Sequence, residues 1–555
     1  MKRIYLIYCL LVGISFSGYS QNDVPDVTST FALTNANVVV RPGTTLEKTT
    51  VIIKDGYIQQ VGSNLSIPFD AEIIEADSMF VYAGFIAGLS HIGLKKQEEN
   101  KENDNSVKAH NPPPAAAGIT PDVSSSNQLD PKHSTIAGFR NQGFALAHVV
   151  PKGRMMAGKG SLVLLKGDTP EAMVLQEDMS LYGSLLASQT RVYPSTTIGV
   201  MSKWREMYRQ AELAAKHESK FKSGSAGVKR PTFDSSIKSM YDVTSKSIPV
   251  FFHAPKTLDL SRAMSLQKEL GFNMVAANTK QAFKLMDKVK RANLPLVISL
   301  DLPKKAKEEK KKKDDKESDE TEEMIALKER AMQSKKEYES QAAVLEESGI
   351  PFSFSVTDTK AGDVKKNIMR MIEAGLSEDA ALAALTTNPA KILGIQQLAG
   401  TVERGRFANL IVSDTSYFKE KANIRYVFVE GKKYEMEIKE KKEKKEGDSD
   451  AVIDLAGTWS LDLSADGTDI SGTIEIEKSG DSYTGSMTTD MSPKTEFDSI
   501  EVDGNNVIIK LSANAGGGSA PVVVDIVVEN DEFEGTVNIA NGMMTADVSG
   551  SKEPN

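Results

Sequence analysis

The segment Val81-Tyr-Ala-Gly-Phe-Ile-Ala-Gly-Leu-Ser-His-Ile-Gly-Leu94 is apolar almost throughout and carries one histidine, His91. A short, continuous apolar run of this kind is typical of a strand that is buried on both faces. Residues two apart in a strand point to the same face, so Leu89 and His91 share one face. A histidine in place of Leu89 would aim two imidazoles at one metal ion. The segment therefore predicts a buried strand with half of a metal-binding pair.

The composition indicates how many domains to expect and which class of partner is excluded. With 555 residues, of which 40% are hydrophobic, the chain can bury more than one core, and we expect two or three domains. The formal net charge is -9, and no basic stripe with interleaved aromatic residues occurs. This composition argues against a nucleic-acid partner.

The N-terminus has the layout of a secretory signal peptide over residues 1–20. Lys2 and Arg3 precede an apolar run from Ile4 to Phe16, and small residues follow before Gln21. An uncleaved membrane anchor is the alternative, but the run is shorter than the roughly 20 residues that span a bilayer. We therefore expect a secreted or periplasmic protein without stable membrane insertion. The only cysteine, Cys9, would be removed with the peptide, leaving no thiol and no disulfide.

The middle of the chain alternates between strand-like and helix-like patterns. Strand-like runs include Gly143 to Val150, Ile248 to His253 and Phe352 to Val356, and amphipathic patterns follow several of them. Such alternation predicts an α/β fold with a parallel sheet or barrel. In a (β/α)₈ barrel the C-terminal ends of the strands form the site, which is where His253 and Asp358 fall.

Several separated segments resemble the amidohydrolase superfamily, in particular its imidazolonepropionase-like members. The opening strand is similar to the family's Pro-Gly-Phe-Ile-Asp-Ala-His-Thr-His-Leu signature, with matches at Gly84, Phe85, Ile86 and His91 and departures at Ala83, Ala87 and Leu89. The stretch from Gly375 to Gly394 resembles the family's helix with its Ala-Leu-Thr-x-x-Pro-Ala motif. The resemblance implies a (β/α)₈ TIM-like barrel over residues 81–397. It also implies a composite small β-sandwich built from residues 21–80 and 398–438.

The remaining segments lie outside that resemblance. Residues 303–323 and 439–450 mix lysine with acidic residues and predict a solvated insertion and a linker. Residues 451–555 show short alternating runs between turn signals, which predicts an antiparallel all-β domain. Leu455-Ala-Gly-Thr-Trp-Ser460 resembles the entry to the first strand of lipocalin-like barrels.

The resemblance also implies a site. His91, His253 and Asp358 match positions at which the family binds metal, and the aspartate at the position of Asp358 takes the proton from the attacking water. Asn278 stands at the position of the sixth-strand histidine, and the stretch Leu181-Tyr-Gly-Ser-Leu offers no fourth-strand lysine or glutamate. Two imidazoles and a carboxylate can hold one Zn²⁺ or another divalent ion and activate its water. The alternative is that no metal is bound.

The other histidines are predicted to be inert. His110, His133 and His217 lie in polar sequence, and His148 lies in an apolar strand-like run, where a core role is more common than a ligand role.

Two functions follow and both stay open. One is a metal-dependent hydrolase that acts on a carbon–nitrogen bond of a small molecule, such as a cyclic amide. The other is a metal-free pseudoenzyme or binding protein that captures a ligand or partner with the barrel mouth and the C-terminal domain, and the changes at Leu89 and Asn278 motivate it. Either form is compatible with a homo-oligomer.

Overall fold

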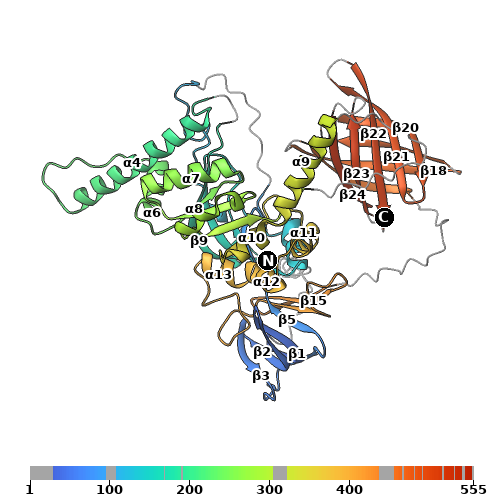
Figure 1. Ribbon diagram of the computed structural model, residues 1–555, viewed down its shortest axis with the longest axis horizontal. Coiled ribbons are helices and arrows are strands. Elements are labelled where there is room, and N and C mark those ends of the chain that lie inside the picture. Colours follow the sequence, from blue (N-terminus) through green and yellow to red (C-terminus); the bar gives the residue numbers. More distant parts are fainter. Residues whose placement is uncertain are drawn as a thin grey trace, which may run out of the picture. The chain divides into compact units, whose positions relative to one another are not determined.

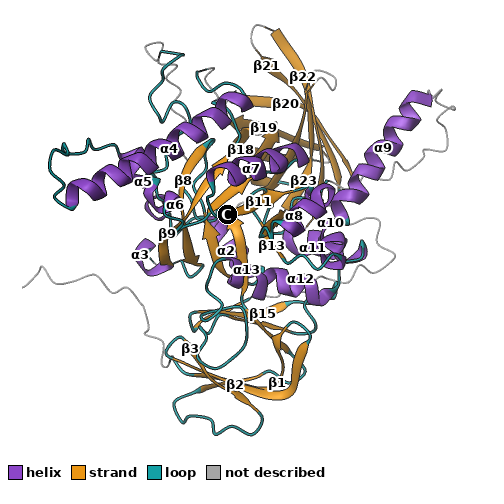
Figure 2. Cartoon of the chain, turned by 60° about the vertical axis from the view of Figure 1, so that its left-hand side comes forward, coloured by secondary structure: helices purple, strands orange, loops and turns teal. Residues whose placement is uncertain are grey.

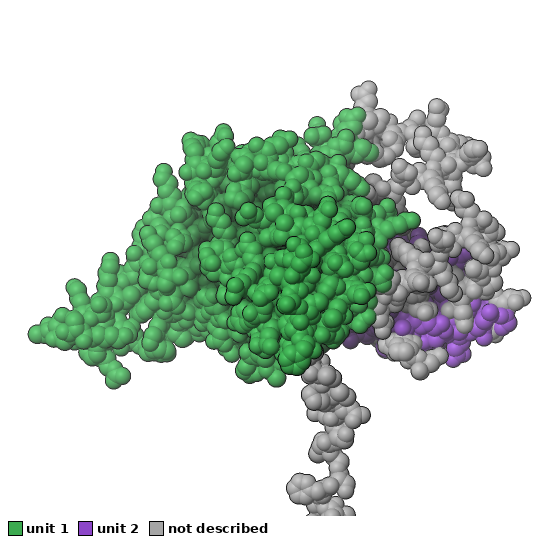
Figure 3. Space-filling model, turned by 90° about the horizontal axis from the view of Figure 1, so that it is seen from below, with its two compact units in different colours: residues 1–438 green, residues 439–555 purple. Residues whose placement is uncertain are grey.

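The computed structural model describes residues 29–95, 108–167, 169–188, 192–303, 322–436 and most of 455–552, with short gaps at 466–467, 481, 491, 516–517, 530–531 and 540–543. The predicted signal peptide, Cys9, most of the charged insertion and the linker lie outside the described residues. The chain divides into two compact units, residues 1–438 and residues 439–555 (Figure 3).

The first unit contains a mixed sheet built from two distant parts of the sequence. Its strands lie in the order β16-β15-β14-β5-β1-β2-β3, and β4 pairs with β1. Their bounds are β1 Phe31–Arg41, β2 Thr44–Lys54, β3 Tyr57–Gly62, β4 Glu72–Glu75, β5 Phe80–Ala83, β14 Leu410–Ser413, β15 Ile424–Val429 and β16 Lys432–Glu435. Figure 1 shows the early and late strands side by side.

The two parts of this sheet join where β14 pairs antiparallel with β5, with Ile411 opposite Tyr82. Asp55 and Gly56 both adopt positive φ and form the turn between β2 and β3, a conformation that the Asp-Gly pair favours. Because β5 leads directly into the barrel, this sheet fixes the start of the first barrel strand.

The first unit also contains a closed barrel with strand order β10-β11-β12-β13-β6-β7-β8-β9. The bounds are β6 Phe85–Ser90, β7 Phe144–Val149, β8 Met156–Leu164, β9 Val174–Ser184, β10 Val250–His253, β11 Met274–Thr279, β12 Leu296–Ser299 and β13 Phe352–Ser355. The prediction of a buried strand after Val81 is confirmed, since every residue of β6 is buried.

The expectation of a regular (β/α)₈ barrel is confirmed only in part. β8 runs antiparallel to both β7 and β9, whereas the other neighbouring strands are parallel. The physical reason is the short connection from Val149 to Met156, which can join antiparallel strands but is too short for a parallel crossover.

Helices flank the barrel strands (Figure 2). Their bounds are α2 Ser134–Asn141, α3 Pro170–Met173, α4 Thr197–Lys222, α5 Ser235–Ser239, α6 Tyr241–Thr244, α7 Thr257–Leu270, α8 Met286–Arg291, α9 Glu322–Glu339, α10 Gln341–Glu347, α11 Asp363–Glu373, α12 Glu378–Leu385 and α13 Thr387–Ile392, with short 3-10 turns η1 Ser126–Gln128 and η2 Ala282–Leu285. α7 ends at Gly271, which adopts the left-handed conformation common at helix C-termini. α11 buries Val364, Ile368 and Met371 on one face.

The second unit is a closed antiparallel barrel in which each strand pairs with the next and β17 pairs with β24. The strands are β17 Gly457–Ala465, β18 Thr468–Ser479, β19 Ser482–Thr489, β20 Ser492–Asp503, β21 Asn506–Ala515, β22 Gly518–Glu529, β23 Glu532–Ile539 and β24 Met544–Ser551. Alternate apolar residues, Trp459, Val524 and Phe533 among them, form its own core. The predicted all-β antiparallel fold is confirmed for this unit.

No helix in the described part of the chain is both long enough and apolar enough to cross a bilayer.

Candidate functional site

His91 follows β6 at the end of the barrel where that strand finishes. Its Nδ1 lies 2.8 Å from the carbonyl oxygen of Val150, which follows β7. A carbonyl oxygen only accepts hydrogen bonds, so Nδ1 carries the proton and Nε2 keeps its lone pair. Burial lowers the pKa of His91 to about 4, against the opposing effect of the Val150 hydrogen bond. The imidazole is therefore neutral at pH 7.

His253 is the last residue of β10, opposite Ser184 of β9 and Ala277 of β11. Its Nδ1 lies 3.1 Å from the hydroxyl of Tyr182. Burial lowers the pKa of His253, and the charge of Asp358 acts in the opposite direction. His253 is thus a second neutral imidazole at the same end of the barrel.

Tyr182 of β9 links the two histidines. Its ring lies edge-on to the rings of both His91 and His253, with centroids 6.2 Å apart in each pair. Burial and the charge of Asp358 both raise the pKa of the Tyr182 phenol, so it stays protonated at neutral pH. Sequence reasoning missed this residue, because it searched the fourth-strand stretch only for lysine or glutamate. No sequence signal marked Tyr182, since β9 also carries the hydroxyls of Ser180 and Ser184.

Asp358 lies in the turn after β13, and its side chain is 49% exposed. Its Oδ2 accepts a hydrogen bond of 2.8 Å from Nδ2 of Asn278, and the ammonium of Lys280 lies 4.0 Å away. Asp358 also affects the pKa values of His91 and His253 electrostatically. The structure therefore brings the three sequence-predicted site residues to one end of the barrel.

Asn278 sits at a local irregularity of β11. It adopts a positive φ of 54°, and the pairing between β11 and β12 shifts register between Ala277 and Thr279. The side chain of Asn278 is buried, and its Oδ1 has no hydrogen-bond partner among the residues that the structure describes. The residue at the predicted sixth-strand position thus holds Asp358 through its amide nitrogen.

Leu89 does not form part of this polar group. It is completely buried and belongs to an apolar cluster that includes Phe251, Val275 and Val297. The leucine that stands where the family signature has a histidine therefore extends the apolar core of the barrel.

Lys280 and Asp301 complete the polar group, and sequence reasoning identified neither. The ammonium of Lys280 lies 2.5 Å from Oδ2 of Asp301, which follows β12. No motif marked these residues, since they meet only because β11 and β12 are neighbours in the barrel.

The amidohydrolase superfamily is generally metal-dependent, so we tested whether these residues fit a metal ion. Within the described ranges, no three His, Cys, Asp or Glu side chains lie together as they would around a metal. An amide N–H donor and an ammonium also face the carboxylate of Asp358. The residues do not fit the metal as they stand. The ligand set of His91, His253 and Asp358 stays a prediction, and no chemical step is derived through a metal.

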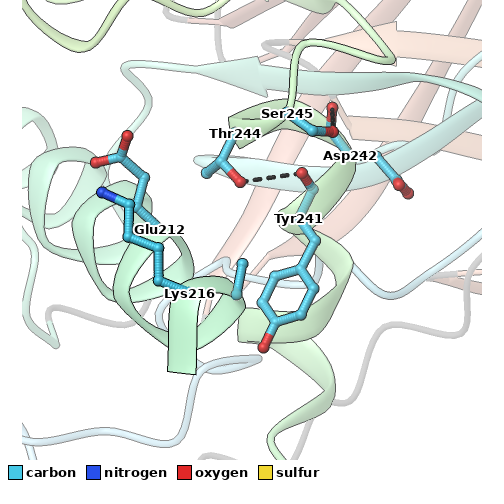
Figure 4. Close-up of a pocket in the computed structure, with 7 residues that line it drawn as sticks. Glu212, Lys216, Tyr241, Asp242, Thr244 and Ser245 are labelled. Carbon is cyan, nitrogen blue, oxygen red and sulfur yellow. Dashed lines mark hydrogen bonds between the residues drawn. The ribbon is translucent and has the colours of Figure 1, made fainter. Parts of the chain in front are cut away.

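A pocket of about 310 Å³ lies elsewhere, on the outside of the barrel between α4 and α6 (Figure 4). Glu212 and Lys216 of α4 line it together with Tyr241 and Thr244 of α6. None of the candidate site residues lines this pocket, so it is separate from the barrel mouth.

The remaining histidines have local roles. His148 is completely buried in the barrel, with Nε2 at 2.8 Å from the hydroxyl of Ser180. His133 accepts a hydrogen bond from the backbone N–H of Thr135 at the start of α2. His217 contacts the carbonyl oxygen of Lys229, and His110 is exposed.

Comparisons with known proteins bear on this geometry. Residues 244–434 match the model of the Amidohydrolase family. Among solved structures, an amidohydrolase from Thermotoga maritima MSB8 is 21% identical with a TM-score of 0.60, covering 73% of this chain and 100% of that chain. A putative prolidase from Bifidobacterium longum is 16% identical with a TM-score of 0.43, covering 74% and 95%. A search of curated proteins found no match. The resemblance predicted from the sequence is confirmed.

Proposed function

Since residues 244–434, which include barrel strands β10 to β13, match the Amidohydrolase family model, we propose that the barrel mouth hydrolyses a carbon–nitrogen bond of a small molecule. One observation carries the proposal. Asp358, which lies in the matched region, is at the same end of the barrel as His91, Tyr182 and His253 and acts on all three electrostatically. The C-terminal ends of the strands are where barrel enzymes bind substrate.

Asp358 is the proton acceptor in this proposal. Asn278 donates to Oδ2 and so fixes the orientation of the carboxylate, while the half-exposed side chain stays open to solvent. A water molecule attacks the carbonyl carbon as Asp358 takes its proton, and the proton then passes to the leaving nitrogen. The products are an acid and an amine. General base catalysis of this kind contributes about 10²- to 10⁴-fold in rate.

Tyr182 and His253 are positioning residues. Their hydrogen bond joins β9 to β10, and their burial keeps both neutral. Of the two carboxylates at the mouth, Asp301 is paired with Lys280 at 2.5 Å, whereas Asp358 is held by Asn278, so Asp358 is the proton acceptor in this proposal.

Turnover by the Asp358→Asn variant tests the proposal. We expect the wild type to release amine from at least one member of a panel of lactams, cyclic imides and N-acyl amino acids. Asp358→Asn should reduce that rate at least about 100-fold, with an unchanged unfolding transition. Asp287→Asn, an exposed carboxylate on α8, is the matched control and should keep full activity. Unchanged turnover in Asp358→Asn would rule out this role.

The positions of Leu89 and Asn278 favour a second function, that of a metal-free binding protein. Leu89 is part of the core, and Asn278 binds Asp358, so the mouth can bind a ligand without turning it over. In that case compounds of the same panel would raise the unfolding temperature of the protein, and no amine would be released from them. Amine release by the wild type would exclude it.

A further inference from the structure

Lys280 places a positive charge beside the carboxylates of the barrel mouth. It directly follows β11, and its backbone N–H donates to the carbonyl oxygen of Pro255 at 3.0 Å, which ties it to the segment after β10. Its ammonium lies 2.5 Å from Asp301 and 4.0 Å from Asp358. The side chain is 29% exposed, so the charge is partly shielded from solvent. One lysine therefore faces carboxylates from the ends of two other strands.

We infer that Lys280 is the resident cation of this site and takes the charge-balancing place that a divalent metal ion holds in the superfamily. The inference rests on the proposed function only in that it concerns the same site. It assigns to a side chain of this protein the positive charge that offsets Asp358.

The charges of the group support this assignment. Asp301 and Asp358 are the two carboxylates, Lys280 is the cation, and His91 and His253 are neutral because they are buried. A divalent ion bound to Asp358 would lie close to the ammonium, and like charges at such distances repel strongly in a partly buried site. Lys280 therefore disfavours a divalent ion at Asp358.

The hydrogen bond from Asn278 also disfavours a divalent ion at Asp358. Its Nδ2 donates to the same oxygen of Asp358 that Lys280 approaches, so two donors already face that oxygen. Its Oδ1 is buried without a partner among the described residues. A metal ion at Oδ2 of Asp358 would have to displace the amide donor as well as approach the ammonium.

Removing the charge tests the inference. Cobalt(II) alone is titrated into wild type, Lys280→Met and Lys280→Arg, and binding is followed by visible d–d absorption, with zinc(II) competition as confirmation. We expect no saturable cobalt binding in the wild type or in Lys280→Arg. Lys280→Met should bind cobalt saturably, with half-saturation at least tenfold below the highest cobalt concentration that leaves the wild type unsaturated, and the added substitution Asp358→Asn should abolish that binding. Lys284→Met, which removes a nearby cation paired with Glu337, should behave like the wild type.

Two results would overturn the inference. One is saturable cobalt binding at Asp358 in the wild type, and the other is a folded Lys280→Met variant that gains no affinity. Circular dichroism establishes folding, and Lys280→Gln serves as the second neutral variant if the methionine variant does not fold. The readout needs no turnover, so a chain that hydrolyses none of the panel compounds fails the proposed function without affecting this result.

Discussion

His148 shows how one buried imidazole couples the stability of the barrel to pH. Its ring lies between Gly88, whose carbonyl oxygen is 3.2 Å from Nδ1, and the hydroxyl of Ser180 at Nε2. The ring also packs on Phe251 at a centroid distance of 4.3 Å. Burial lowers the pKa of His148 from 6.5 to about 4, because a charged ring inside the barrel would lose its hydration.

The pH dependence has a definite sign. Below pH 6.5 the unfolded chain binds a proton at His148 that the folded chain excludes, so stability present above pH 6.5 is lost as pH falls toward 4. A depression of this size corresponds to roughly 3 kcal/mol for one group. We expect His148→Gln to remove that part of the acid sensitivity in urea unfolding at pH 7.5 and 4.5. An identical loss of stability between these pH values in variant and wild type would contradict the assignment.

Individual site residues differ in how well the sequence predicts them. His253 ends a recognisable strand, Asp358 lies in the turn after one, and a helix follows each, so local pattern places both at the barrel mouth. Tyr182 and Lys280 carry no such signal. Their importance comes from contacts with residues 71 and 78 positions away, respectively, and only the strand order of the barrel makes those contacts.

At the scale of elements, the direction of β8 is what the sequence does not predict. The residue pattern of an apolar strand does not show whether the strand runs parallel or antiparallel to its neighbours, since side chains alternate between the two faces in both cases. The short connection before β8 was the only local sign of a hairpin. The composite sheet is the opposite case, because the family resemblance implies that its two distant parts come together, and β14 pairs with β5.

β8 also depends on a glycine in the barrel interior. A Cβ on Gly160 would lie 2.6 Å from both Nε2 of His148 and Oγ of Ser180, and 2.8 Å from Val150. We expect Gly160→Ala to lower the free energy of unfolding by about 1–3 kcal/mol, since overpacking forces neighbours in a filled core to move. Urea unfolding measures this change.

Gly362→Ala is the matched control for that experiment. Gly362 has helical φ and ψ, and no atom lies within 4 Å of an added Cβ. Its substitution should leave stability unchanged or raise it slightly. Equal effects of the two alanine substitutions would show that the contact between β8 and the His148–Ser180 pair is not tightly packed.

At the scale of the whole molecule, the chain combines a closed barrel, half of which matches the Amidohydrolase family model, with a lysine among the carboxylates at the barrel mouth. The first unit, residues 1–438, contains every candidate site residue, and the second unit, residues 439–555, has a separate core around Trp459. The sequence predicts both folds because each repeats a pattern over many residues. It does not predict the charge balance of the mouth, which depends on residues from β11, β12 and β13 meeting at one end.

The metal content of the full-length protein tests this account most directly. Elemental analysis is made on protein purified without chelator, alongside the His253→Ala and Asp358→Ala variants. The account predicts no stoichiometric transition metal in any of the three, because Lys280 supplies the positive charge beside Asp358. About one zinc or other transition metal ion per wild-type chain, lost in both variants, would contradict it and show that His253 and Asp358 hold a metal ion.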